Sequence, residues 1–197
     1  MAIAARVARL SGAVSFVGWL ALGLVPAPAL AKCADPFSGL LVPQISSFTQ
    51  TRHFQGLTNA LVSKGKVQIF PDRVHWHVSE PVDILTVIAE SGVSQSIEGG
   101  VAQAMGPQSG DLFLSSSGLR DVLSGKFAAA RAQYTITNLP AAKNGDWRLR
   151  LVPRAAQLAS VIQHLDVQGC ANVQNLKLQQ PSGDWMDIQL APQLKQS

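Results

Sequence analysis

The histidines are the side chains best suited to metal binding or catalysis, and two of them stand two residues apart. His75 and His77 lie in a segment, residues 73–79, whose polar and apolar residues alternate as in a β-strand. Two imidazoles on one strand face have a spacing that could provide two ligands to a zinc ion. Because Arg73 and Ser79 share that face, we expect it to face solvent and to hold no metal.

Catalytic motifs are absent from the sequence. No HExxH, CxxC or GxSxG segment occurs, and the other two histidines, His53 and His164, have no sequence partners that suggest a triad. The glycines at 99–100 and 106 lack the strand–loop–helix frame of a phosphate-binding loop. We therefore expect no catalytic residue and no cofactor, and we expect the protein not to be an enzyme.

The two cysteines, Cys33 and Cys170, are expected to form a disulfide. Both lie outside residues 1–31, which have the features of an export signal, and export would bring them into an oxidising compartment. A bond across so long a loop could contribute roughly 4–5 kcal/mol in the chain-entropy model. The alternative is a lipidated Cys33, but lipidation requires a small residue before the cysteine, and Lys32 stands there.

Residues 1–31 resemble a secretory signal peptide. Arg6 and Arg9 give a positive start, an apolar core covers about residues 10–24, and Ala-Leu-Ala at 29–31 suits cleavage before Lys32. An apolar core of about 15 residues is short for a membrane span. We therefore expect an exported mature chain, residues 32–197, that forms a single domain.

The composition excludes two classes of protein. Hydrophobic residues make up 47% of the chain and charged residues 14%, which is the opposite of a disordered sequence. The net charge is +4 for the whole chain and +2 once the signal is removed, so there is no basic stripe for nucleic acid.

The elements of the mature chain are mostly short strands. Val74, Trp76 and Val78 share one face of the strand at 73–79. The other expected strands lie near 48–55, 62–70, 84–90, 93–98, 131–139, 147–151, 160–168, 173–180 and 185–190. Turn residues separate them, and those at 181–184 are typical of a hairpin. About ten strands with short connections predict a mainly β fold built as one highly curved sheet or barrel.

Two short helices are expected over the open face of this sheet. Asp35 and Pro36 are typical of a helix start, and that helix would run to Leu41 because Pro43 ends it. The second would span about residues 110–126, with weak helix formers at 115–118. Its apolar stripe consists of Leu112, Leu119, Val122 and Leu123.

The sequence has more large apolar residues at inward positions than a small sheet and two short helices need to form a core. The large residues expected to point inward are Phe54, Phe70, Trp76, Leu85, Val87, Phe113 and Phe127. An ordinary core would explain each of them alone. Together they permit a cavity suited to an acyl chain, in which each buried methylene gains ~0.8 kcal/mol.

The order of several motifs resembles the LolA-type outer-membrane lipoprotein carriers. Phe48-Thr49-Gln50 forms an FxQ strand, a glycine-containing strand follows at 63–67, and Trp76 precedes Pro81 by a few residues. Gly183-Asp184 and the alternating residues after it resemble the late hairpin of the family. The order fits most of residues 36–191, with firm motifs over about 48–81, and it is closest to the divergent LolA-related branch.

The resemblance implies an incomplete, strongly curved antiparallel β-barrel with a helical lid, which carries acyl chains of lipoproteins through the periplasm. The concave face would then be lined by Val67, Ile69, Val74, Trp76 and Val78, and the apolar pattern adds Phe54, Phe70, Leu85 and Val87. The lid would contain Leu112, Phe113, Leu119, Val122 and Leu123. The implied partners are an acyl chain or lipidated protein, an inner-membrane donor and an outer-membrane acceptor, with the protein itself a monomer.

One residue departs from the carriers. The family has an arginine just before the proline that corresponds to Pro71, and this arginine holds the lid until cargo arrives. Here that position is Phe70, and Arg73 is expected to point in a different direction from it. A cargo other than a lipoprotein therefore fits as well. The alternative function is a periplasmic sensor or interaction protein of the same fold that binds no lipid.

Overall fold

A computed structural model of the chain describes residues 33–38, 45–105 and 117–193. Contacts within the chain separate Met1–Ala31 from Lys32–Ser197, so every described residue belongs to the second unit. The expected signal peptide and its cleavage site before Lys32 lie outside the described residues. Within the described ranges, no helix has both the length and the apolar character needed to span a membrane.

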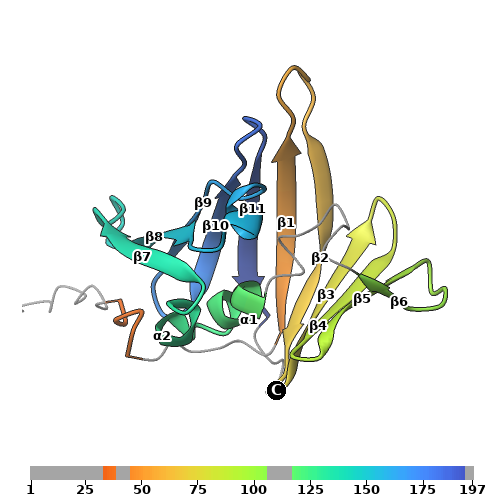
Figure 1. Ribbon diagram of the computed structural model, residues 1–197, viewed down its shortest axis with the longest axis horizontal. Helices are drawn as coiled ribbons and strands as arrows, with labels where there is room; N and C mark the ends of the chain where they lie inside the picture. The colour runs from red at the N-terminus through yellow and green to blue at the C-terminus, as the bar shows by residue number, and fades with distance from the viewer. Residues whose placement is uncertain (1–32, 39–44, 106–116, 194–197) are drawn as a thin grey trace, which may run out of the picture. The chain divides into compact units, whose positions relative to one another are not determined.

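Strands dominate the described residues (Figure 1). The strands are β1 (Ile45–His53), β2 (Leu61–Ile69), β3 (Arg73–Glu80), β4 (Ile84–Ala89), β5 (Gly92–Ile97), β6 (Gln103–Met105), β7 (Tyr134–Leu139), β8 (Trp147–Pro153), β9 (His164–Gly169), β10 (Val173–Gln179) and β11 (Trp185–Pro192). The helices are α1 (Ser117–Leu123), α2 (Phe127–Ala130) and α3 (Ala156–Ala159).

All eleven strands form one antiparallel sheet, in the order β6-β5-β4-β3-β2-β1-β11-β10-β9-β8-β7. Consecutive strands of the chain are neighbours in the sheet except for β6 and β7, and the β1–β11 pair joins the first and last strands at its centre. Strands β6 and β7 are the two edges, so the described sheet curves without closing. The predicted incomplete, strongly curved antiparallel barrel is therefore confirmed.

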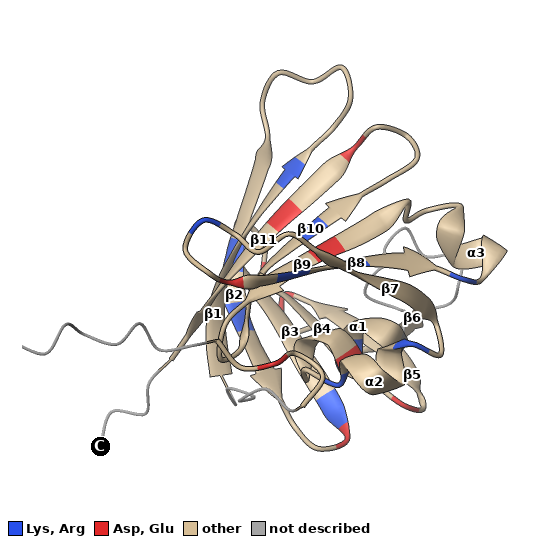
Figure 2. Ribbon diagram, turned by 90° about the vertical axis from the view of Figure 1, so that its left-hand side faces the viewer, with Lys and Arg blue, Asp and Glu red and all other residues tan. Residues whose placement is uncertain are grey.

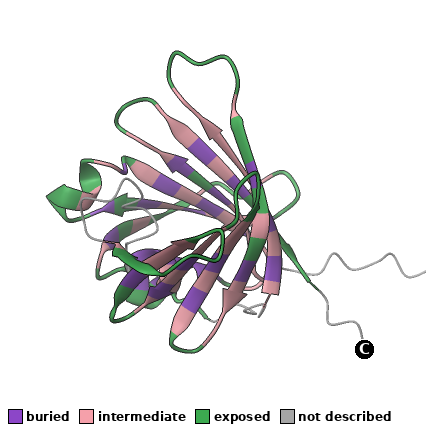
Figure 3. Ribbon diagram, turned by 90° about the vertical axis from the view of Figure 1, so that its right-hand side faces the viewer, coloured by how far each residue is buried: buried purple, intermediate pink, exposed green. Residues whose placement is uncertain are grey.

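The concave side of the sheet contains the core. Figure 3 shows buried and less buried residues alternating along the strands, as expected for a sheet with one covered face. Helices α1 and α2 lie on the concave side, between the β1–β6 half and the β7–β11 half (Figures 1 and 2). Leu119 and Val122 of α1 and Phe127 of α2 are fully buried there. These short helices thus cover part of the apolar face that the strands leave open, which confirms the helical lid.

The outer face of β8–β11 carries a row of charged residues. Arg150 on β8, Asp166 on β9, Lys177 on β10 and Asp187 on β11 stand directly opposite one another in successive strand pairs. Charged residues mark these strands in Figure 2. Opposite charges on adjacent strands attract, so this row favours the observed register of the four strands.

Several expected elements differ from those observed. The three-residue β6 and the four-residue α2 and α3 were not expected, because such short segments show no periodicity. At 35–41, the described residues form a turn: the Phe37 amide donates to Asp35 Oδ1 at 2.9 Å, and the Ser38 amide donates to the Asp35 carbonyl oxygen. Residues 39–41, and residues 110–116 of the second expected helix, lie outside the described residues.

Candidate functional site

A pocket of about 240 Å³ opens on the concave side of the β1–β5 half, beside β11. Its walls come from six strands and from the turn between β3 and β4. The described residues that line it are Gln50, Arg52, Leu61, Ser63, Trp76, Val78, Pro81, Val82, Ile84, Thr86, Gln95 and Met186. The lining is therefore amphipathic, with apolar and polar side chains in the same space.

The apolar wall is centred on Trp76. Its side chain is 1% exposed, and its ring centroid lies 4.4 Å from that of Phe48 on β1. Val78 follows on the same face of β3, opposite Ile84 of β4. Strand alternation places all of these side chains on the concave face, so the FxQ phenylalanine supports the back of the pocket wall.

A glycine permits this close packing. Gly65 stands opposite Phe48, at a bulge where β2 meets β3. A Cβ atom at this position would overlap the carbonyl oxygen of His77 and lie 2.9 Å from the ring of Phe48. Only glycine therefore leaves room for Phe48 to reach Trp76 across the strand.

The polar wall is built from β1, β2, β4 and β5. Thr86 on β4 is 1% exposed and stands opposite Trp76 of β3. It accepts a hydrogen bond from Gln95 Nε2 at 3.1 Å. Gln50 on β1 stands opposite Ser63 on β2, which is also buried. These groups give the pocket donors and acceptors beside its apolar wall.

Arg52 lies near the end of β1, opposite Leu61 of β2 and Met186 of β11. Its guanidinium carbon is 5.0 Å from the centroid of the Phe54 ring, a cation–π geometry that orients the side chain. Among the described residues that line the pocket, Arg52 is the one with a formal charge.

Exposed apolar residues lie in the lining of the pocket and in the loops at the same end of the half-sheet. Leu61 is 50% exposed and Val82 is 40% exposed, and both line the pocket itself. Leu57, Ile97 and Val101 are also exposed and lie in or beside the loops that connect strands at this end of the half-sheet. We call these five residues the apolar rim. A surface of this kind typically marks a site that contacts lipid or another protein.

A second hollow lies on the other side of the sheet. This groove of about 400 Å³ is more open and runs over β11, β1 and β2, where its lining includes Ser47, Thr49, Lys64 and Lys66. It lacks the tryptophan-centred wall and the apolar rim, so it is less suited to an apolar ligand.

Five of the predicted cavity residues lie on the concave face, in the core or in the pocket lining, and a sixth, Phe54, does not line the pocket. Val67 and Val74 are fully buried in the core, and Ile69 packs against it on the same face. Trp76 and Val78 line the pocket. Phe54 lies just beyond β1, half-buried under the guanidinium of Arg52 and outside the residues that line the pocket.

Three predicted cavity residues lie on the wrong face. Leu85 and Val87 stand opposite His77 and His75, on the outer side of the sheet, because Trp76 pairs with Thr86. Phe70 also lies on the outer side, where its ring centroid is 4.8 Å from that of His75 and 4.9 Å from the guanidinium carbon of Arg73. The expectation that Arg73 points away from Phe70 is therefore wrong as well.

The described lid residues are fully enclosed. Leu119, Val122 and Leu123 of α1 are buried in the core, and α1 packs against β4. The other two predicted lid residues, Leu112 and Phe113, lie outside the described residues.

His75 and His77 lie on the outer face of β3. Arg73 Nε donates to His75 Nε2 at 3.2 Å, and burial, followed by the charge of Arg73, lowers the pKa of His75. His77 Nε2 lies 2.9 Å from Asp83 Oδ2. Each histidine thus has its own partner. Among the described residues, the group of three potential metal ligands is Cys33, Asp146 and Cys170, whose two sulfurs are bonded to each other and offer no thiolate.

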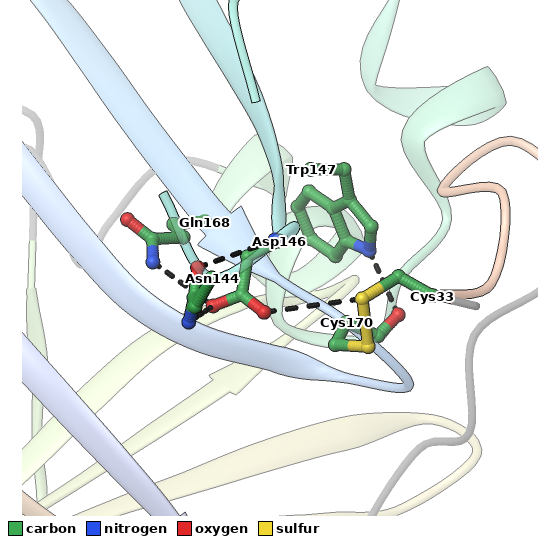
Figure 4. The surroundings of a disulfide bond; sticks show 6 residues. All are labelled: Cys33, Asn144, Asp146, Trp147, Gln168 and Cys170. Carbon is green, nitrogen blue, oxygen red and sulfur yellow. Dashed lines mark hydrogen bonds between the residues drawn. A yellow bond between two sulfur atoms is a disulfide. The ribbon is translucent and has the colours of Figure 1, made fainter. Parts of the chain in front are cut away.

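The disulfide between Cys33 and Cys170 confirms the predicted pairing and fits a protein of an oxidising compartment. Figure 4 shows its surroundings: Trp147 Nε1 donates to the Cys170 carbonyl oxygen at 2.8 Å, and the side chains of Asn144 and Gln168 donate to Asp146 Oδ2. Asp146 Oδ1 is 3.9 Å from the sulfur of Cys33, which has no hydrogen to donate in a disulfide, so this is a contact.

No protein-family model matches the sequence, and no curated protein matches it. The structure has a likeness to a LolA superfamily protein from Nitrosomonas europaea, with a TM-score of 0.41 and 8% identity over 75% of this chain and 83% of that one. A DUF1329 family protein from Desulfovibrio piger gives a TM-score of 0.42 and 11% identity over 79% and 88% of the two chains.

A third likeness is with a Vibrio parahaemolyticus domain named for outer membrane lipoprotein sorting. Its TM-score is 0.39, and its identity is 9% over 74% of this chain and 83% of that one. All three TM-scores are below 0.5, so none of these likenesses assigns a function to this chain.

Proposed function

We propose that this chain is a periplasmic carrier that binds an acyl chain in the concave pocket and releases it at another membrane, without catalysing a reaction. The observation that supports this most is the pocket itself. It combines a buried tryptophan wall with the exposed apolar side chains of Leu61 and Val82, on a concave face that α1 and α2 partly cover. A lipidated protein or another acylated molecule would present the chain.

The size of the pocket limits how a long chain is held. At about 240 Å³ it is smaller than the 300–1,000 Å³ typical of ligand sites. Part of a long acyl chain would therefore lie over the apolar rim, or α1 would shift and uncover more of the concave face. Each methylene removed from water gains ~0.8 kcal/mol, so even partial enclosure gives a reversible affinity.

The proposed location follows from two features of the chain. The N-terminal segment has the pattern of a cleaved signal, and the described residues contain a disulfide. The carrier would receive its cargo from an inner-membrane donor and deliver it to an outer-membrane acceptor. Mass spectrometry of the exported protein should find Lys32 as the first residue, and a retained segment 1–31 would contradict this.

Titration with a fluorescent fatty acid tests the binding step. Val78→Asp places a hydrated carboxylate in the apolar wall beside Trp76, where an acyl chain would lie, so we expect this variant to lose the ligand. Val152→Asp is the matched control, because Val152 is 41% exposed on β8, whose residues are outside the pocket lining. Equal binding by wild type and Val78→Asp, or no binding by wild type, would overturn the proposal.

A further inference from the structure

The groove of about 400 Å³ on the outer side of the sheet follows a row of short side chains on β1, and we call it the outer groove. Ser47 and Thr49 form its floor. Across β2 they stand opposite Lys66 and Lys64, and on β11 Thr49 stands opposite Gln189. The longer side chains rise on both sides of the short ones, so the outer face is hollow along β1. Unlike the concave pocket, the outer groove has a volume within the range of roughly 300–1,000 Å³ that is typical of ligand sites.

The formal charge in the outer groove is positive. Lys64 and Lys66 line it, and the described residues of its lining include neither Asp nor Glu. Lys64 Nζ lies 3.4 Å from Glu80 Oε2, in an ion pair whose two side chains are more than half exposed. Lys66 is exposed and has no ion-pair or hydrogen-bond partner among the described residues. The two lysines are two residues apart on one face of β2, about 7 Å at the backbone, so their like charges repel each other.

Uncharged polar groups lie beside the lysines. The Thr49 hydroxyl and the Gln189 amide have no hydrogen-bond partner within the described ranges. The hydroxyls of Ser47 and Ser79 donate to backbone carbonyl oxygens of neighbouring strands at 3.3 Å, and their oxygens keep lone pairs that can accept a hydrogen bond. The outer groove therefore offers both donors and acceptors next to its positive charge.

We propose that the outer groove binds a phosphorylated sugar. Its phosphate lies between the ammonium groups of Lys64 and Lys66, which supply charge-assisted hydrogen bonds and lose their mutual repulsion. Its sugar hydroxyls, which both donate and accept, lie against Thr49 and Gln189. A phosphate alone would fill a small part of the groove. Because the outer groove and the concave pocket lie on opposite sides of the sheet, this inference is independent of acyl-chain binding.

Isothermal titration calorimetry with glucose 6-phosphate, glucose and inorganic phosphate separates the two parts of the site. Wild type should bind glucose 6-phosphate at least tenfold more tightly than either of the others, because only this ligand uses both the lysines and the uncharged groups. Thr49→Val keeps the shape of the side chain and removes its hydroxyl. This variant should therefore reduce the preference for glucose 6-phosphate over inorganic phosphate.

The charge is tested by Lys66→Met, which should weaken the binding of glucose 6-phosphate about tenfold. Lys143→Met is the matched control, because Lys143 is exposed in the loop between β7 and β8 and removes the same charge outside the groove. It should bind as wild type does. Equal weakening by the two substitutions would overturn the site, since it would show a general attraction between the protein and an anion.

Co-sedimentation with vesicles identifies the source of the ligand. Phosphatidylinositol has a phosphorylated polyol as its head, so vesicles of phosphatidylcholine with and without this lipid are compared. Binding of glucose 6-phosphate without a preference between the vesicles supports a free sugar phosphate. A preference for phosphatidylinositol that Lys66→Met removes supports a lipid head. Binding of neither would overturn the proposal, and inorganic phosphate bound as tightly as glucose 6-phosphate would overturn the sugar.

Discussion

Trp76 is the residue on which the pocket wall depends, because it is buried between Phe48 and Thr86. Trp76→Ala should lower the free energy of unfolding by about 3–5 kcal/mol, through lost burial and the cavity left behind. Trp185 on the outer face stacks on His53 with centroids 3.7 Å apart, and Trp185→Ala should cost only about 1 kcal/mol. Urea unfolding measures both, and equal losses would show that Trp76 is not part of a packed wall.

Asp166 makes the stability of the sheet depend on pH. Burial by itself raises the pKa of this carboxyl, but two hydrogen bonds of 2.7 Å from Arg150 and the charge of Arg150 outweigh it, so the pKa is lowered from its ordinary value of 3.8. A carboxyl with a lowered folded-state pKa stabilises the fold above its unfolded pKa and loses that contribution as the pH falls through the folded value.

Wild type should therefore lose stability more steeply than Asp166→Asn as the pH is lowered from about 5 to below 3.8. Thermal melting across this range measures the difference between the two slopes. Because the pair is partly exposed, the total effect should be modest. Parallel curves for the two proteins would show that the Arg150–Asp166 pair contributes nothing.

At the scale of single residues, alternation predicted the faces of β3 but not those of β4. Val74, Trp76 and Val78 alternate with polar residues, so their shared face could be read from the sequence. Strand β4 is apolar on both faces, so the sequence alone does not show whether Leu85 and Val87 or Ile84 and Ile88 face the concave side. The register with β3 places Ile84 and Ile88 there. Arg52 and Thr86 were missed because apolarity was the criterion for the cavity. The parity of Arg52 with Phe48 and Gln50 would have placed it on the concave face.

Among the elements, α1 covers part of the concave face and packs closely against the sheet. Gly118 near its start lies so close to Tyr134 of β7 that a Cβ atom would overlap the aromatic ring. Gly118→Ala gains about 1 kcal/mol of helix propensity but forces α1 away from the sheet, at a cost of about 1–3 kcal/mol. We therefore expect a less stable protein whose α1 amides exchange faster with solvent.

A double-mutant cycle identifies the cause of this change. If the ring of Tyr134 is the obstacle, Gly118→Ala should be less damaging in a Tyr134→Leu background, with a coupling free energy of about 1 kcal/mol. Additive effects of the two substitutions would contradict the close packing of α1 against β7.

At the element scale, strands were predicted well where turns and alternation coincide, as in the β10–β11 hairpin around Gly183. The pairing of β1 with β11 depends on residues far apart in the chain, so no local pattern could show it. The turn at Asp35-Pro36 illustrates the opposite problem: its residues suit a helix start, but the side chain of Asp35 bonds back to the amide of Phe37 and forms a local turn instead.

For the whole molecule, the disulfide joins the turn at residues 33–38 to the residue that follows β9. Cys33 and Cys170 are separated by 137 residues in the chain, so the bond removes much freedom from the unfolded state. Cys33→Ser should lower the free energy of unfolding by about 2–5 kcal/mol. Reducing agent should lower the melting temperature of wild type and leave that of Cys33→Ser unchanged. An effect of equal size on both proteins would show that the reductant acts elsewhere.

Native mass spectrometry of the protein purified from its own periplasm tests most directly whether it carries an acyl chain. We expect wild type and Val152→Asp to retain an acylated ligand that collisional activation releases, and Val78→Asp to be recovered folded and without it. A ligand-free wild type that co-purifies with a protein partner, or a ligand retained equally by Val78→Asp, would contradict the account and favour an interaction protein that binds no lipid.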